Sequence, residues 1–167
     1  MEERVLIAYA SRLGSTRRVA ESIGNILKDA EIDVDVKNVN DVDDISSYTS
    51  VIIGSAAKSG KLLTEARKFA VKFKNDIKKL KTAYFTVCLT EPYDDEKSFM
   101  NAEYSLEPLK EIKEPVCLGL FAGKPDIKSL RWFLRHILRK AKTEEAEVGN
   151  WDDIESWADE LKYKLLH

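Results

Sequence analysis

The chain has 167 residues with 27 basic and 29 acidic side chains, and a net charge of −2 gives no general affinity for nucleic acid. Its hydrophobic content of 44%, with 7 glycines and 4 prolines, excludes disordered, collagen-like and low-complexity classes. Because a chain of this length is enough for one hydrophobic core, we predict a single domain over residues 1–167.

Five short apolar runs have the length and composition of β-strands. The runs at residues 5–10, 51–54, 83–89 and 116–122 are apolar without alternation, which is typical of strands that are covered on both faces. Residues 32–36 alternate apolar and charged side chains, which indicates one solvent-exposed face and therefore a strand at the edge of a sheet.

Amphipathic segments separate and follow these runs. Apolar residues recur at helical spacing over residues 15–30, 62–80, 97–113, 126–142 and 151–166. We expect Ser15 or Thr16 to cap the first of these helices and Asn150 to cap the last. The alternation predicts a doubly wound α/β fold, in which a five-stranded parallel sheet of order 2-1-3-4-5 carries helices on both faces.

Ligands of such sheets bind at the carboxyl ends of the strands, where the strand order switches. The first loop at this edge, residues 11–16, combines three hydroxyl side chains, Gly14 and the amino end of a helix. Unpaired amide groups and the helix dipole both favour an anion, so the loop predicts a phosphate cradle to which Arg12 adds charge. The alternative is an ordinary helix cap.

Two other phosphate-binding motifs do not fit the sequence. The segment from Gly54 to Gly60 is one residue too long for a P-loop, and Leu62 stands where a serine or threonine would bind magnesium. No G-x-G-x-x-G dinucleotide motif follows the first strand.

The motif Ser11-x-x-Gly14-x-Thr16 after the first strand, with residues 54–60 and 86–90 after the third and fourth strands, resembles the flavodoxin superfamily. Over nearly the whole chain the sequence is most similar to the flavodoxin-like, quinone-linked protoporphyrinogen oxidase family. The resemblance implies a flavodoxin-like fold and FMN as the cofactor, with no metal.

The resemblance also implies which residues bind the flavin. The phosphate would be held by Ser11, Arg12, Gly14, Ser15 and Thr16. The isoalloxazine ring would be bordered on one side by Ala56, Ala57, Lys58 and Gly60, and on the other by Val87, Cys88, Leu89 and Thr90. Lys58 would stabilise the reduced flavin electrostatically, and Tyr93 is the one nearby aromatic residue that could stack on the ring.

Three functions agree with this resemblance. The first is an FMN-dependent oxidoreductase that moves electrons between a small organic donor and an acceptor, for which the long segment 91–114 would form a pocket wall. The second is an electron carrier without its own substrate, and the third is a cofactor-free interaction module. The acidic residues Glu91, Asp94, Asp95 and Glu96 predict repulsion of a substrate that bears carboxylates.

The predicted helix 126–142 has a basic stripe beside its apolar stripe. The stripe contains Lys128, Arg131, Arg135 and Arg139, and Trp132 lies next to it. One interpretation is a docked surface helix with extended basic side chains. The other is a surface for anionic lipid or an acidic redox partner, and the interaction module would act through this helix.

The remaining reactive side chains give weaker indications. Cys88 and Cys117 lie in apolar runs, where packing is favoured over a redox role, and neither His136 nor His167 has a visible catalytic partner. We expect no signal peptide, because residues 1–10 lack a basic start and a long apolar core, and we find no apolar stretch of the roughly 18 residues that a membrane-spanning helix needs. We therefore expect a cytoplasmic protein, peripheral to the inner face of the membrane if the basic helix binds lipid.

Overall fold

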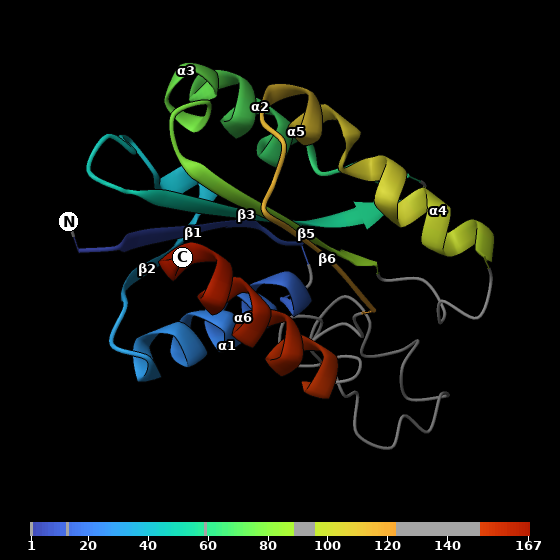
Figure 1. The fold of residues 1–167 in the computed structure, drawn as a ribbon. Helices are drawn as coiled ribbons and strands as arrows, with labels where there is room; N and C mark the ends of the chain where they lie inside the picture. Colours follow the sequence, from blue (N-terminus) through green and yellow to red (C-terminus); the bar gives the residue numbers. More distant parts are fainter. Residues whose placement is uncertain (1, 13, 59, 89–95, 123–150) are drawn as a thin grey trace.

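The computed structural model describes residues 2–12, 14–58, 60–88, 96–122 and 151–167 (Figure 1). Its strands are β1 (Arg4–Ala10), β2 (Asp33–Asn38), β3 (Ser50–Lys58), β4 (Lys61–Leu62), β5 (Lys81–Cys88) and β6 (Cys117–Ala122). Its helices are α1 (Ser15–Asp29), α2 (Thr64–Lys72), α3 (Lys74–Ile77), α4 (Glu96–Ser105), α5 (Glu107–Ile112) and α6 (Trp151–Leu166), with a short 3₁₀ turn η1 (Val39–Asp41).

The strands form one sheet in the order β2-β1-β3-β5-β6, and all four of these pairings are parallel. This is the predicted order 2-1-3-4-5 of the long strands, so the fold-class prediction is confirmed, with β2 at the edge. The sequence pattern did not predict β4, which has two residues and pairs antiparallel with β3.

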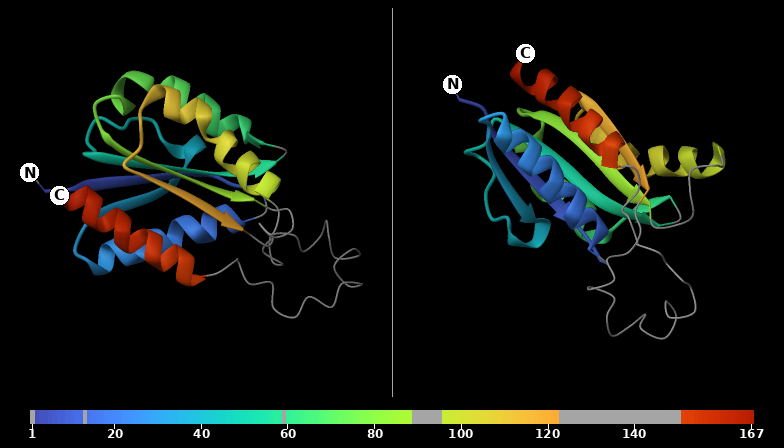
Figure 2. Two further views of the ribbon diagram at one scale, coloured as in Figure 1. Left: turned by 45° about the vertical axis from the view of Figure 1, so that its right-hand side comes forward. Right: turned by 90° about the horizontal axis from the view of Figure 1, so that it is seen from below.

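Helices cover both faces of the sheet. Helices α1 and α6 lie side by side on one face, and α2 to α5 lie on the other (Figures 1 and 2). Each face has its own apolar core, with Val19 and Trp157 in the first and Phe69 and Leu109 in the second. Residues 5–8 of β1 are completely buried, as expected for a strand that is covered on both sides.

The prediction of a single helix over residues 62–80 is wrong. Lys61 and Leu62 belong to β4, and two helices, α2 and α3, follow it with a break at Phe73. The Phe73 carbonyl accepts hydrogen bonds from the amides of both Asp76 (3.0 Å) and Ile77 (2.9 Å), which starts a new turn. The apolar periodicity hides this break because both helices bury their apolar residues against the same face of the sheet.

The helix predicted over residues 97–113 is also divided. Helix α4 ends at Ser105 and α5 begins at Glu107, with Pro108 in the first turn of α5. A proline has no amide hydrogen to donate and its ring clashes with the preceding turn, so α4 cannot continue through this position.

Candidate functional site

The loop between β1 and α1 presents the amino end of a helix at the carboxyl edge of the sheet. Gly14 is the residue before the helix, with φ of 86°, and its amide donates to the Ser11 hydroxyl at 3.1 Å. The prediction that Ser15 or Thr16 caps the helix is wrong: both lie inside it, because only glycine readily adopts the left-handed conformation that starts α1 here.

Two features of the first turn of α1 favour an anion. The residue before the helix, Gly14, has no side chain that could cap it, and no acidic residue lies in the first turn. The Arg18 amide donates to the Gly14 carbonyl at 3.0 Å, and an α-helix does not use the amides that precede this bond in its own i to i−4 hydrogen bonds. Their dipoles therefore add up at the loop.

Thr16 has a polar atom with an unmet hydrogen bond. Its side chain is 1% exposed, and its Oγ1 has no hydrogen-bond partner among the described residues. A buried hydroxyl without a partner costs about 1–3 kcal/mol. A ligand oxygen beside the helix terminus that accepts a hydrogen bond from this hydroxyl would offset the cost. We therefore interpret the loop as an anion site.

The side chain of Arg12 is held in an ion pair. Its guanidinium forms a bidentate ion pair with Glu65 of α2, with 2.9 Å between Nη1 and Oε2 and a second, very short contact through Nη2. This pair joins the loop after β1 to the helix that follows β4.

The segment after β3 is a hairpin rather than the predicted open loop over 54–61. Strand β3 continues to Lys58 and returns as β4, with Ala57 opposite Leu62 and Lys58 opposite Lys61. Gly60, with φ of 75°, makes the tight turn. A hydrogen bond from the Leu63 amide to the Ser55 hydroxyl (3.1 Å) fixes the returning chain.

Strand β5 brings the third predicted group of residues beside this hairpin. Ala56 pairs with Val87 and Ala57 with Cys88, so the ends of β3 and β5 lie in register. Val87 is completely buried and Cys88 is half-buried. Leu89, Thr90 and Tyr93 lie outside the described residues, as do the side chain of Lys58 and the basic helix predicted over 126–142.

Thr86 is a polar residue at this edge that the sequence analysis did not single out. It is completely buried, lies opposite Ser55 in the sheet, and its Oγ1 has no partner in the described part of the chain. The sequence signal that could have identified Thr86 as a candidate site residue is its position two residues before the end of an apolar strand.

The geometry at this edge therefore consists of an anion cradle after β1 and two adjacent strand ends that follow β3 and β5. A family model described as a flavodoxin domain matches residues 6–149. The chain belongs to this flavodoxin domain family. The resemblance that was read from residues 11–16, 54–60 and 86–90 is thus confirmed at the level of the family.

Three known proteins show how this flavodoxin domain relates to others. It is 21% identical to protoporphyrinogen IX dehydrogenase [quinone] of Escherichia coli K12, over 96% of this chain and 95% of that protein. It is 37% identical to probable flavodoxin 1 of Bacillus subtilis over 86 residues, which cover 49% of this chain and 54% of that protein. A flavin mononucleotide-bound flavodoxin mutant of Fusobacterium nucleatum superposes with a TM-score of 0.54 at 18% identity, over 74% and 71% of the two chains.

A cavity of about 240 Å³ lies beside the β3–β4 hairpin of this flavodoxin domain. Its lining includes Gly60, Leu62, Arg67, Tyr104, Pro108 and Glu111. The Tyr104 side chain is 69% exposed, and an ion pair of 3.2 Å between Lys110 and Glu107 borders the space. Part of this lining comes from segment 91–114, which the sequence analysis expected to form a pocket wall, and the break between α4 and α5, which was not predicted, shapes it.

Two groups near the sheet remain uncharged at neutral pH. Burial, with the carboxylate of Glu160 nearby, raises the pKa of the Cys117 thiol to about 11. Burial likewise raises the pKa of Tyr84 to about 12, and its hydroxyl donates to the Lys113 carbonyl at 2.8 Å. Both shifts favour the neutral thiol of Cys117 and the neutral phenol of Tyr84.

Two features are absent from the described part of this flavodoxin domain. None of the helices in the described part combines the length and the apolar character that crossing a bilayer requires. Within the same ranges, no three His, Cys, Asp or Glu side chains are grouped as metal ligands would be.

Proposed function

We propose that this flavodoxin domain binds FMN at the carboxyl edge of its sheet and transfers electrons through it. The buried Thr16 hydroxyl at the amino end of α1, which has no hydrogen-bond partner among the described residues, carries this proposal, because it fits a phosphate oxygen in the cradle. Membership of the family and an FMN-bound structural relative support the identity of the ligand. The bound flavin supplies the electron-transfer chemistry.

The chain's own residues would hold the two ends of the cofactor. Ser11, Gly14, Ser15 and Thr16 would surround the phosphate, with backbone amides of the first turn of α1 as donors. The hairpin residues Ala56, Ala57, Lys58 and Gly60 and the strand-end residues Val87, Cys88, Leu89 and Thr90 would border the ring, with Tyr93 available to stack on it.

We expect the protein to distinguish FMN from riboflavin, which lacks the phosphate. Two charge-assisted hydrogen bonds in the cradle, each contributing about 1.5–3 kcal/mol, make FMN bind at least about 100-fold more tightly. Titration of purified protein with each flavin, followed by flavin fluorescence, measures both affinities. Saturable quenching by neither flavin contradicts the proposal, and equal affinities contradict the phosphate cradle.

In this proposal Arg12 positions the loop and does not touch the phosphate, because its guanidinium already pairs with Glu65. We expect Arg12→Ala and Glu65→Ala each to weaken FMN binding by about threefold, since exposed ion pairs contribute up to about 1 kcal/mol. The double variant should bind FMN no more weakly than either single variant. A loss confined to Arg12→Ala would instead indicate direct contact with the phosphate.

A finer proposal is that the protein is an oxidoreductase with its own substrate, passing electrons from a small organic donor to a quinone acceptor. The relative in Escherichia coli, aligned over almost the whole chain, and the cavity beside the hairpin support it. The acidic residues Glu91, Asp94, Asp95 and Glu96 favour a donor with fewer carboxylates than a porphyrinogen has.

Anaerobic mixing with candidate donors tests this enzyme proposal. Loss of flavin absorbance on adding protoporphyrinogen IX or a smaller donor, and its return on adding a soluble quinone, would support an enzyme. Reduction by a reductase protein but by none of the organic donors would support the carrier, which the similarity to a probable flavodoxin favours.

A further inference from the structure

The outward face of α2 and α3 concentrates positive charge. Six of the thirteen residues from 67 to 79 are basic and one, Asp76, is acidic, which gives +5 in a chain of net charge −2. All six basic side chains are exposed. We call them the basic α2–α3 surface, which consists of Arg67, Lys68, Lys72, Lys74, Lys78 and Lys79.

These cations are not neutralised by ion pairs in the described part of the chain. The carboxylate of α2, Glu65, is paired with Arg12. Arg67 donates to the Thr64 hydroxyl at 3.4 Å, and the Lys72 ammonium stands 5.0 Å from the centre of the Phe73 ring. Like charges held this close repel one another, so an acidic partner would be attracted to the surface.

An apolar groove lies within the basic α2–α3 surface. Its volume is about 390 Å³ and it is lined by Thr64, Arg67, Lys68, Val71 and Lys72. The Val71 side chain is 69% exposed, whereas the apolar stripe of the same helix is buried against the sheet. An exposed apolar side chain with charged groups around it has the arrangement of a protein interface, an apolar centre with a polar rim.

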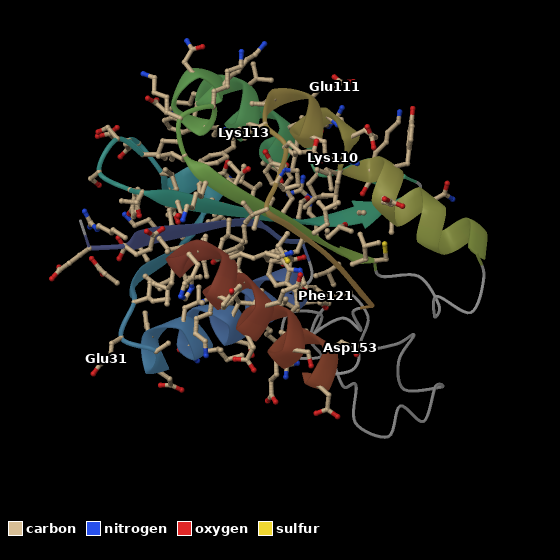
Figure 3. The ribbon with its side chains drawn as sticks, viewed as in Figure 1. Glu31, Lys110, Glu111, Lys113, Phe121 and Asp153 are labelled. Atoms are coloured by element: carbon tan, nitrogen blue, oxygen red, sulfur yellow. The ribbon has the colours of Figure 1, made fainter. Side chains whose placement is uncertain are left out.

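The helices of the opposite layer have a net charge of −2, because α1 and α6 together carry five basic and seven acidic residues. Figure 3 shows Lys110 and Lys113 on the side of α2 and α3, and Glu31 and Asp153 on the side of α1 and α6. The Lys113 ammonium donates to the Lys78 carbonyl at 3.2 Å, which extends the basic α2–α3 surface toward α5. An acidic partner would therefore be steered to one layer of the molecule.

We propose that the basic α2–α3 surface docks an acidic protein, with an apolar side chain of that partner in the groove at Val71 and its carboxylates on Lys68 and Lys72. A membrane is disfavoured because an interfacial helix inserts its apolar stripe into lipid, and the stripe of α2 faces the sheet. Docking itself does not require flavin. That the partner exchanges electrons with this protein rests on the proposed function.

The location of the groove suits the docking of a partner that exchanges electrons with this protein. Thr64, which begins α2 and lines the groove, follows the β3–β4 hairpin by one residue. A partner seated at Val71 would therefore lie on the flank of the segment proposed to border the flavin ring. Electron transfer between two proteins requires their redox centres to lie close together, but it does not require a shared active site.

The test uses an acidic [2Fe–2S] ferredoxin as the probe and isothermal titration of the full chain. We expect binding at 20 mM salt that weakens at least about 10-fold at 200 mM, because screening shortens the range of the attraction. Lys68→Glu/Lys72→Glu should lose at least about 10-fold in affinity, and Val71→Ser should lose about threefold without any change of charge.

The control variant Lys28→Glu/Lys162→Glu changes net charge by the same amount on α1 and α6, and should retain affinity within about twofold. No binding of ferredoxin, or equal losses in both double variants, would overturn the docking surface. Binding through Lys68 and Lys72 to vesicles with anionic lipid but not to ferredoxin would replace it with a membrane site. FMN titration of the same variants separates the docking proposal from the proposal of FMN binding. Ferredoxin binding can be lost while FMN binding is unchanged, and FMN binding can be absent while ferredoxin still binds.

Discussion

Gly54→Ala should lower the free energy of unfolding by about 3 kcal/mol, the upper part of the range for overpacked cores. A methyl group on Gly54 would lie 2.0 Å from Cζ of Phe85, its partner on the neighbouring strand β5. Phe85 cannot move aside easily, because its ring packs against Phe121 and Trp157, with centroids 6.1 and 6.0 Å away. Urea unfolding of the unliganded protein measures the loss.

A double-mutant cycle provides the control for this prediction. Phe85→Ala alone should cost about 3–5 kcal/mol because it leaves a cavity. Adding Gly54→Ala to that variant should cost less than about 1 kcal/mol, since the methyl group then meets no ring. Two additive losses would contradict the packing of Phe85 over Gly54.

Thr16→Asp should weaken FMN binding at least about 100-fold and leave riboflavin binding unchanged. A carboxylate about 4 Å from a phosphate charge is repelled by about 4 kcal/mol at the effective dielectric constant of a protein surface. The same carboxylate interacts favourably with the amino end of α1, which has no acidic residue in its first turn, but Thr16 is buried, so desolvation should make the unliganded variant less stable than the original protein. Flavin titrations and thermal unfolding measure these effects.

Thr16→Val is the matched variant without a charge. It removes the hydroxyl that we place on the phosphate, so FMN binding should weaken by about 10-fold. The unliganded protein should be at least as stable as the original, because the variant no longer buries an unpartnered hydroxyl. Unchanged FMN affinity in both variants would remove Thr16 from the proposed cradle.

The sequence predicted those parts of the fold that depend on burial. The apolar runs of β1, β3, β5 and β6 lie between two helical layers, and only such strands lack alternation. The alternating pattern over 32–36 correctly placed β2 at the edge. Periodicity could not find the break at Phe73, because α2 and α3 use the same apolar face. The break between α4 and α5 had a local signal in Pro108, which periodicity alone does not take into account.

The candidate site likewise has a part that local sequence patterns indicate and a part that depends on distant segments. The helix start after residues 11–14 was predictable, because Gly14 and the hydroxyl residues beside it are typical of the beginning of a helix, and the phosphate cradle at this position stays a prediction. The partner of Arg12 was not predictable, since Glu65 lies 53 residues further along the chain. The β3–β4 hairpin and the cavity beside it also depend on pairing and packing between distant segments, for which no local pattern exists.

The packing of α6 against α1 bears on how this protein matures during synthesis. Helix α1 carries the cradle, and its buried residues Val19 and Ile23 share a core with Ala158 and Leu161 of α6. A nascent chain would expose part of this apolar surface until residues 151–166 have left the ribosome. Cofactor loading should therefore wait until residues 151–166 have been translated and have packed against α1.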